Sequence, residues 1–352
     1  MNRKIIVFDD EMERAAIEQN VLPAFSGKVI KYLPLVKAAA VFMDPSTTNE
    51  EFTRQAGVKR VINDVKVYAL ETSPAIQKPL QVLPWGVDRI DAEKAWAEST
   101  GSRVKVAVID TGIDTVHPDL KIYGGINTIN KEKSYKDDNG HGTHVAGIIA
   151  ALNNRVGVIG VAHDAMLYAV KVLGADGSGN LSDIIEGLEW CINNNIQVVN
   201  MSLGTDEAED LFHEAIKHVY NARIFIVAAA GNSGPRDNTI SYPAKYPEVA
   251  AVAASSQFDQ IAFFSSRGAE VDLVAPGVNI YSTYRGRSYR KLSGTSMAAP
   301  HVAGAAALVL AKKGVMSPDK LLNHLKETSQ DMHFSPDKQG AGLVDAYISV
   351  TN

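Results

Sequence analysis

The sequence is nearly free of cysteine, since Cys191 is the only one among 352 residues. A lone cysteine excludes a disulfide framework and a zinc site built from several thiolates. Long apolar runs are missing too: the longest, such as 302–311, has about ten residues, whereas a membrane span needs about 20. Charge of one sign is also absent, with 35 Lys and Arg against 40 Asp and Glu and no basic stripe. We therefore expect neither a membrane nor a nucleic acid as a partner.

The residues that are present are typical of a globular protein. Hydrophobic residues make up 45% of the chain and aromatic residues 7%, which is too apolar for a disordered chain. Residues 1–4 are basic, but the apolar stretch after them ends at Phe8, short of the roughly 7–15 residues of a secretory signal. We expect an extracellular location if a signal peptide was removed from this chain, and a cytoplasmic one otherwise.

The N-terminal part of the chain has its own pattern of short elements. The pattern predicts strands at 4–8, 28–33, 38–43 and 58–65, the last leading into 67–70, and helices at 11–19 and 49–55. A segment with two prolines and no periodicity follows and is typical of an exposed linker. We expect a small α+β domain over 1–71, a linker over 72–80 and a larger domain over 81–352.

The larger domain alternates apolar strands with helices. Strands are predicted at 104–109, 166–172, 198–201, 224–229 and 249–253, and helices at 144–152, 181–193, 211–220, 296–313 and 317–328. This alternation predicts an α/β fold, with a parallel, mostly doubly wound sheet covered by helices on both faces. Ligand sites of such sheets lie beyond the carboxyl ends of the strands. Polar residues follow the strands there: Asp110, Asn200, Ser202 and Asn232.

Three segments carry residues suited to chemistry. Segment 108–114 contains Asp110, segment 139–147 (Asn-Gly-His-Gly-Thr-His-Val-Ala-Gly) contains His141, and segment 293–304 (Ser-Gly-Thr-Ser-Met-Ala-Ala-Pro-His-Val-Ala-Gly) contains Ser296. Taken singly, each also fits a turn, a glycine-rich loop or a helix start. Taken together, they supply an acid, a base and a nucleophile for one mechanism, in the order Asp, His, Ser.

With a fourth segment, Val-Ala-Ala-Ala-Gly-Asn-Ser-Gly at 227–234, the chain closely resembles the subtilisin-like serine proteases, bacterial subtilisins in particular, which have the same order of catalytic residues. The resemblance covers the chain from about Gln81 to its end. It implies a serine endopeptidase that cleaves protein and peptide substrates through an acyl-enzyme. Ser296 would attack the carbonyl carbon, and His141 would act as base and then acid. Asp110 would orient His141, and Asn232 would bind the oxyanion.

The resemblance also implies a cleft for an extended substrate. Two edge segments would sandwich the substrate by β-augmentation, and a pocket would hold the residue before the cut. No acidic residue is evident around that pocket, so we expect broad specificity that leans toward apolar residues. The edge segments are Gly177, Ser178, Gly179 and Ser202, Leu203, Gly204; the pocket wall is Ala229, Ala230, Gly231, and its floor is Ser241.

Calcium is the cofactor that the resemblance implies. A tight site would combine side-chain oxygens with backbone carbonyls in an all-oxygen shell, which suits Ca²⁺. The residues of the tight site are Gln81, Asp119, Leu152, Asn154, Val156 and Val158; a weaker site would use carbonyls of Ala244, Tyr246 and Val249.

The N-terminal unit resembles the family's propeptide in length and order of elements. This implies an intramolecular chaperone and inhibitor whose tail lies in the active-site cleft, in a chain that is otherwise a monomer. The enzyme itself would cut that tail, somewhere between Thr72 and Leu80. A permanent N-terminal domain is the competing interpretation.

Three other interpretations fit the sequence less well. An α/β-hydrolase esterase needs the order Ser, acid, His, and only 56 residues follow Ser296. A non-catalytic binding protein on a protease fold finds no support, since the triad residues and Asn232 are present. His144 and His141 have the spacing of a metal-binding pair, but no third ligand such as cysteine is near them.

Overall fold

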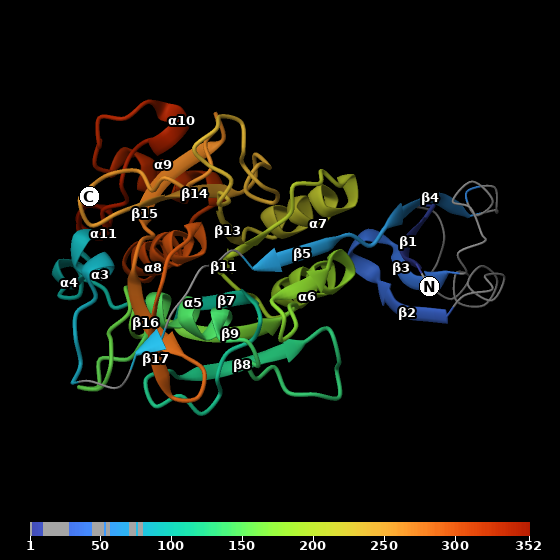
Figure 1. Ribbon diagram of the computed structural model, residues 1–352, viewed down its shortest axis with the longest axis horizontal. Helices are drawn as coiled ribbons and strands as arrows, with labels where there is room; N and C mark the ends of the chain where they lie inside the picture. The colour runs from blue at the N-terminus through green and yellow to red at the C-terminus, as the bar shows by residue number, and fades with distance from the viewer. Residues whose placement is uncertain (1, 10–27, 44–52, 54–56, 70–74, 77–79) are drawn as a thin grey trace.

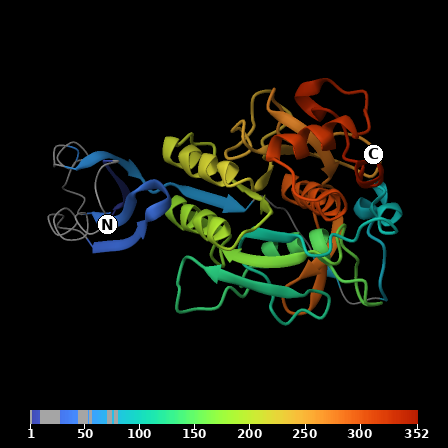
Figure 2. The same cartoon turned by 180° about the vertical axis from the view of Figure 1, so that it is seen from behind.

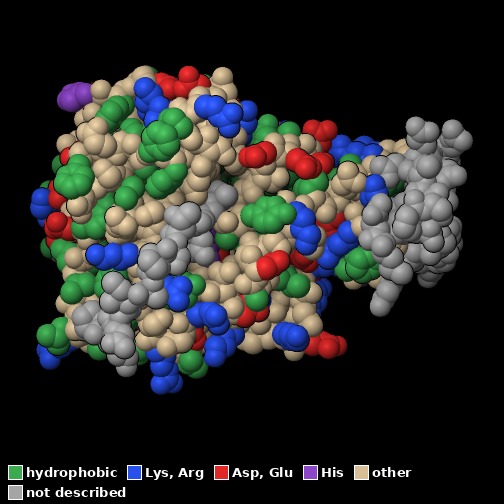
Figure 3. Space-filling view, viewed as in Figure 1, with side chains coloured by type: hydrophobic (Ala, Val, Ile, Leu, Met, Phe, Trp, Pro, Cys, Tyr) green, Lys and Arg blue, Asp and Glu red, His purple; other side chains and the backbone are tan. Residues whose placement is uncertain are grey.

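The computed structural model describes residues 2–9, 28–43, 53, 57–69, 75–76 and 80–352. The helices expected at 11–19 and 49–55 lie outside the described residues, apart from Thr53. Within the described part of the chain, no helix has the length and apolarity needed to cross a membrane. On the face seen in Figure 3, side chains of both charge signs are interspersed.

A seven-stranded sheet in which all neighbouring strands are parallel forms the centre of the larger domain. The five strands expected from the sequence are its inner strands, and the α/β prediction is confirmed. The two edge strands were not predicted. In order across the sheet the strands are β15 (Val271–Pro276), β14 (Ala250–Ser255), β13 (Phe225–Ala229), β11 (Val198–Met201), β7 (Lys105–Asp110), β9 (Met166–Lys171) and β8 (Ile122–Asn127).

Helices cover both faces of this sheet, as Figure 1 shows. Alternate residues of β7 point to opposite cores. Val106 and Val108 pack in the core that contains α5 (His141–Ala150) and α8 (Thr295–Lys313). The intervening residues of β7 pack in the core that contains α6 (Leu181–Asn193) and α7 (Asp210–Asn221). Two further helices, α9 (Pro318–Glu327) and α11 (Ala346–Thr351), lie near the C-terminus.

The N-terminal unit contains a four-stranded antiparallel sheet at the far end of the molecule from the C-terminus (Figures 1 and 2). Its strand order is β2 (Lys28–Leu33), β3 (Ala38–Met43), β1 (Asn2–Phe8) and β4 (Val58–Asn63). The short helix η3 (Pro34–Val36) contacts α6 and α7. The unit is therefore held against the helices on one face of the central sheet.

Ion pairs join the N-terminal unit to α6. Lys31 Nζ lies 2.7 Å from Asp183 Oδ1, and Arg3 Nη2 lies 3.4 Å from Asp183 Oδ2. Within the unit, Arg3 Nε lies 2.6 Å from Asp64 Oδ2. Asp64 in turn accepts the backbone N–H of Ser182 at 2.8 Å. Because Ser182 lies in the first turn of α6, the carboxylate of Asp64 satisfies a helix N–H that the helix itself leaves unpaired.

Candidate functional site

Three candidate residues that are far apart in the sequence lie on three elements that contact one another, because α5 contacts both β7 and α8. Asp110 ends β7, His141 begins α5, and Ser296 is the second residue of α8. All three are fully buried. His141 Nδ1 lies 2.8 and 2.9 Å from the two carboxylate oxygens of Asp110. This contact fixes the ring orientation and places the Nδ1 proton toward Asp110, which leaves Nε2 as the basic nitrogen.

Ser296 is tied to the end of a neighbouring strand. Its Oγ donates to the carbonyl oxygen of Ser202 at 3.0 Å, and Ser202 Oγ donates to the Ser296 carbonyl at 2.8 Å. Asn200 Nδ2 donates to Ser202 Oγ at 2.9 Å. These bonds place Ser296 beside the segment that begins β12 (Leu203–Gly204). Its position in the first turn of a 19-residue helix also gives it a positive local potential.

Asn232 is oriented by the residue before Ser296. Its Oδ1 accepts both the backbone N–H and the hydroxyl of Thr295, each at 3.0 Å. The amide is planar, so its Nδ2 donors lie on the side away from these bonds. The side chain is partly exposed and lines a pocket next to the cleft. Asn232 is therefore positioned as a donor close to Ser296.

Asp137 joins the loops that carry Asp110 and His141, and sequence reasoning missed it. Its Oδ1 accepts the Thr111 hydroxyl at 2.9 Å and the Gly140 N–H at 2.8 Å. Its Oδ2 accepts the N–H of Thr143 at 3.0 Å. Burial raises the pKa of Asp137, and the hydrogen bonds from Thr143, Asn139 and Gly140 act in the opposite direction. The only sequence signal was an aspartate shortly before a glycine, which is also common in ordinary turns.

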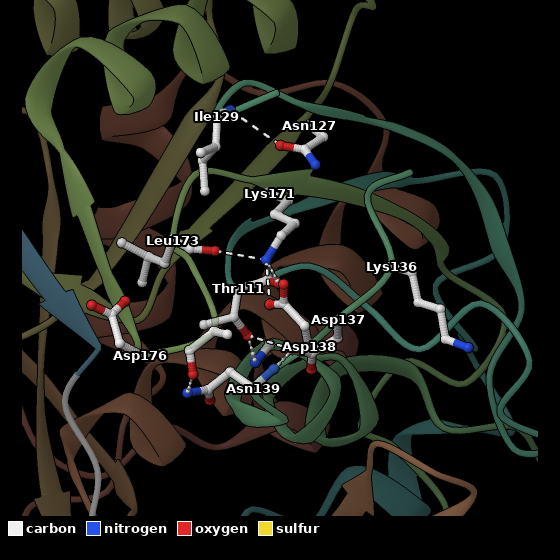
Figure 4. A network of polar contacts seen from close by, with 12 residues as sticks. Thr111, Asn127, Ile129, Lys136, Asp137, Asp138, Asn139, Lys171, Leu173 and Asp176 are labelled. Carbon is white, nitrogen blue, oxygen red and sulfur yellow. Dashed lines mark hydrogen bonds and ion pairs between the residues drawn. The ribbon is translucent and has the colours of Figure 1, made fainter. Parts of the chain in front are cut away.

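Lys171 is a second residue that the sequence did not single out (Figure 4). It is buried at the end of β9, in register with Asp110. Its Nζ donates to the carbonyls of Thr111 at 2.7 Å and Leu173 at 2.8 Å, and to Asp138 Oδ1 at 2.7 Å. One ammonium group thus connects the loop after Asp110, the loop before His141 and the segment leading to the cleft edge.

The predicted cleft edges hold a strand of the N-terminal unit. Strand β5 (Lys66–Ala69) lies between β10 (Ser178–Asn180) and β12, antiparallel to both. Ala69 N donates to the Gly177 carbonyl at 2.8 Å. Val67 is fully buried, whereas Tyr68 is 54% exposed. Two edge segments, 177–179 and 202–204, were expected to lie on either side of a substrate. In the structure they lie on either side of β5, which is a segment of the chain itself.

A pocket of about 380 Å³ opens beside Asn232. Ser241, expected at its floor, is buried and donates its hydroxyl to Asp206 Oδ1 at 3.2 Å. Gly231 lies against Ser241, whereas the side chains of Ala229 and Ala230 are fully buried in the two cores. The pocket is lined by Lys66, Tyr68, Gly204, Thr205, Asp206, Glu207, Asn232, Ser233 and Ser241.

This lining corrects one expectation. No acidic residue was expected at the pocket, but Asp206 and Glu207 both line it. They lie just after β12 in a stretch that matches no catalytic segment, so nothing in the sequence placed them near Ser241. The apolar preference rested on their absence and loses that support.

The residues expected to bind calcium tightly come together. Asp119 is fully buried, and its Oδ2 accepts Val158 N–H at 2.9 Å, while its Oδ1 meets no hydrogen-bond donor in the described structure. Gln81 Nε2 lies 2.7 Å from the Leu152 carbonyl and 3.1 Å from that of Val158. Asn154 Oδ1 accepts Val156 N–H at 2.9 Å. Burial raises the pKa of Asp119 to about 7.

These contacts fit a calcium ion in chemical terms. A buried carboxylate oxygen that meets no donor in the described structure and the carbonyls of Leu152 and Val158 are the hard oxygen ligands that Ca²⁺ takes. Gln81 turns its Nε2 toward these carbonyls, and its Oε1 accepts the Arg155 N–H at 3.0 Å, so its oxygen would join the shell only after the amide turns over. The described residues hold no cluster of three or more His, Cys, Asp or Glu. A shell of the expected kind would not form such a cluster, because it contains a single carboxylate, and its other ligands are amide and carbonyl oxygens. At the weaker site, the Tyr246 carbonyl accepts Val249 N–H at 3.1 Å, and Ala244 is buried nearby in the same core.

His144 is engaged in the protein interior and does not form a metal pair with His141. Its Nε2 donates to the carbonyls of Ile280 at 3.0 Å and Arg290 at 3.1 Å. Burial lowers its pKa to about 3. Its role is structural, because the ring bridges α5 to both strands of the hairpin β16 (Ile280–Tyr284) and β17 (Ser288–Leu292).

Comparisons with known proteins show which proteins this chain is similar to. The model of the Subtilase family matches residues 101–343. An alkaline protease of Alkalihalobacillus alcalophilus is 51% identical over 290 residues, covering 80% of this chain and 75% of the relative. Subtilisin Savinase of Lederbergia lenta is 52% identical over 267 residues, covering 76% and 98%. Subtilisin E of Bacillus subtilis is 44% identical over 319 residues, covering 90% and 81%.

Proposed function

Because the chain belongs to the Subtilase family and is a subtilisin-like serine endopeptidase, we propose that Asp110, His141 and Ser296 form its catalytic triad, with Asn232 as oxyanion donor. The observation that carries this proposal is the hydrogen-bonded contact between His141 Nδ1 and both oxygens of Asp110. It supports a base whose tautomer is set in advance, next to a serine at the start of a helix.

The proposed mechanism proceeds through an acyl-enzyme. Ser296 Oγ leaves its bond to the Ser202 carbonyl, gives its proton to His141 Nε2 and attacks the peptide carbonyl carbon. His141 then protonates the leaving amine. In the second half of the reaction a water molecule takes the place of the serine hydroxyl: it gives a proton to His141, attacks the acyl carbonyl carbon and releases Ser296. Asp110 stabilises the imidazolium at each stage without taking the proton.

The oxyanion would be bound by two kinds of donor. The Nδ2 group of Asn232 is directed away from Thr295 by the bonds to Oδ1. Backbone N–H groups at the start of α8 lie beside Ser296. Donors that are already oriented need little reorganisation when charge develops on the carbonyl oxygen, which is why such groups contribute strongly to catalysis.

We also propose that the chain is a self-processing zymogen. The support is β5, which is paired on both sides within the cleft edges. In this proposal residues 1–71 are a chaperone and inhibitor, 72–80 are a cleavable linker and 81–352 are the peptidase. Among the described residues the pairing in the cleft reaches Ala69, so we expect the cut in the first part of the linker 72–80, which is nearest to Ala69 in the sequence.

Calcium is proposed as the resident ion of the site around Asp119. Gln81, Asn154 and the carbonyls of Leu152, Val156 and Val158 would complete the shell. The ion would supply structural stability in a chain without disulfides. It would also pin the segment near Gln81 to the loop after α5, and it takes no part in peptide hydrolysis.

Labelling with a fluorophosphonate tests the catalytic proposal. The wild-type protein should form one covalent adduct, which peptide mapping assigns to Ser296. Ser296→Ala should form none, while the matched control Ser293→Ala, three residues away, should still be labelled. An adduct on another serine, or labelling of Ser296→Ala, contradicts the assignment.

A further inference from the structure

We propose that Asp206, with Glu207 at the rim, makes the pocket for the residue before the cut select lysine and arginine side chains. This inference deepens the proposed function and rests on it, because it concerns the substrate of the same catalytic site. It replaces the apolar preference that the sequence suggested.

The position of the pocket assigns it to the residue before the cut. Asn232, the proposed oxyanion donor, and Ser241 both line it. Gly204 lines it as well and pairs with Tyr68 of the strand held in the cleft. An extended chain that follows β5 past Ala69 toward Ser296 passes this pocket immediately before it reaches the nucleophile.

The chemistry of the lining favours a polar guest. Among the described residues that line the pocket, those of the peptidase part carry hydroxyl, amide or carboxylate groups or no side chain at all. The aromatic ring of Tyr68 comes from the N-terminal unit. An apolar guest would screen part of Asp206 from water without giving it a partner, which costs free energy. An ammonium or guanidinium group would give it hydrogen-bond donors.

Asp206 is held where it can meet such a guest. The buried hydroxyl of Ser241 donates to its Oδ1 at 3.2 Å. This bond holds the carboxylate close to Ser241 although Asp206 is largely exposed. An ionised carboxylate has acceptor sites left after one such bond. A long basic side chain that enters between Asn232 and Ser241 would therefore end at Asp206.

The strand held in the cleft contributes a basic residue to the lining of this pocket. Among the described lining residues, Lys66 is the single basic one, and it belongs to the strand held in the cleft. When the N-terminal unit is released, Lys66 leaves with it. The mature pocket then keeps its two carboxylates and has no cation of its own among these residues, which is the state that selects a basic substrate.

Matched peptide substrates test this proposal. They differ only in the residue before the cut, which is Lys, Arg, Leu or Glu, and the concentration of active enzyme is set by fluorophosphonate titration. We expect kcat/KM for Lys and Arg to exceed that for Leu by about tenfold, and the advantage to shrink as salt rises. Asp206→Asn should lower the ratio of Lys to Leu by roughly 5- to 10-fold, and Glu207→Gln should lower it less.

Asp210→Asn is the matched control. Asp210 lies in the same stretch, has a side chain that is 92% exposed and does not line the pocket, so the Lys-to-Leu ratio should not change. A wild-type preference for Leu over Lys, or an Asp206→Asn ratio equal to that of the wild type, overturns the inference while the titration still counts active sites. A protein that titrates no sites overturns the proposed function itself, and this inference with it.

Discussion

Lys171 Nζ donates to the Thr111 carbonyl oxygen at 2.7 Å, and Thr111 directly follows Asp110 in the chain. A buried ammonium group at the end of one strand thus holds the backbone just beyond the catalytic end of its neighbour. The same group reaches Asp138 and the Leu173 carbonyl. The geometry of the proposed triad would therefore depend on a residue whose side chain is hydrogen-bonded to the segments beside Asp110 and His141.

Replacement of Lys171 by Met should affect both stability and catalysis. Three acceptors lose their shared donor, which should lower the free energy of unfolding by about 3 kcal/mol. Since the loops of Asp110 and His141 lose a common anchor, kcat should fall while KM changes little. Denaturant unfolding in a Ser296→Ala background and steady-state kinetics measure the two effects.

Lys105→Met is the control for that experiment. Lys105 lies at the opposite end of β7, and its Nζ donates to the Asn194 carbonyl at 2.9 Å. The same side-chain change there should leave kcat unaltered. An equal loss of kcat in both variants would mean that Lys171 acts only through general stability.

Asn232→Ala should lower kcat with little change in KM, because the side chain is proposed to act on the developing oxyanion. For a subtilisin's own asparagine the established loss is about 10²- to 10³-fold in kcat, and a similar loss is expected here. Asn232→Asp is a companion variant of the same size that keeps an acceptor but loses the donors. Activity retained in both variants would remove Asn232 from the mechanism.

Calcium removal should destabilise the folded protein. The shell around Asp119 contains a carboxylate oxygen that meets no donor in the described structure, so an ion there stabilises the folded state alone. Addition of a chelator to Ser296→Ala protein should lower Tm, and excess calcium should restore it. Asp119→Asn should abolish that response, whereas Asp164→Asn, on an exposed turn, should keep it; an unchanged Tm after chelation contradicts the site.

Two buried histidines should make stability fall in acid. Burial lowers the pKa of His144 to about 3 and of His301 to about 4, from an ordinary value of 6.5. Above pH 6.5 neither state binds these protons, so stability is unaffected. Between pH 6.5 and about 4 the unfolded chain takes up protons that the folded chain refuses, and each histidine costs roughly 1.4 kcal/mol per pH unit.

The free energy of unfolding against pH measures this effect, in Ser296→Ala protein with excess calcium. His301→Gln should reduce the slope below pH 6.5 by about one proton, even if the variant is less stable throughout. His333→Gln is the control, because His333 is exposed. A slope that is the same in His301→Gln as in the parent contradicts the assignment.

The inner strands and the main helices could be predicted because most of their residues are buried, and buried residues are mostly apolar. The run at β13 is apolar throughout, and the run at β11 is interrupted only by Asn200, since helices cover both faces of the sheet. The edge strands gave weaker signals: β8 contains Gly124 and Gly125, and β15 contains Asp272 and ends in proline. These patterns resemble turns when they are taken alone.

The candidate triad could be predicted because each member lies in an extended motif. Asp137, Lys171 and Asp206 could not, because their roles come from contacts between segments that are distant in the sequence. Asp206 meets Ser241 across 35 positions, and Lys171 meets Thr111 across 60. Spacing along the chain carries no information about such contacts, so only the folded structure brings them together.

The central claim is a serine endopeptidase that matures itself through Ser296. Intact-mass measurement over time, on wild-type and Ser296→Ala protein purified in parallel, tests this most directly. The account predicts that the wild-type chain loses its N-terminal unit by a cut within the linker 72–80, while Ser296→Ala keeps its full mass until a trace of active enzyme is added. Unaided conversion of pure Ser296→Ala to the mature mass, or a wild-type enzyme that is active with its N-terminal unit still attached, would contradict it.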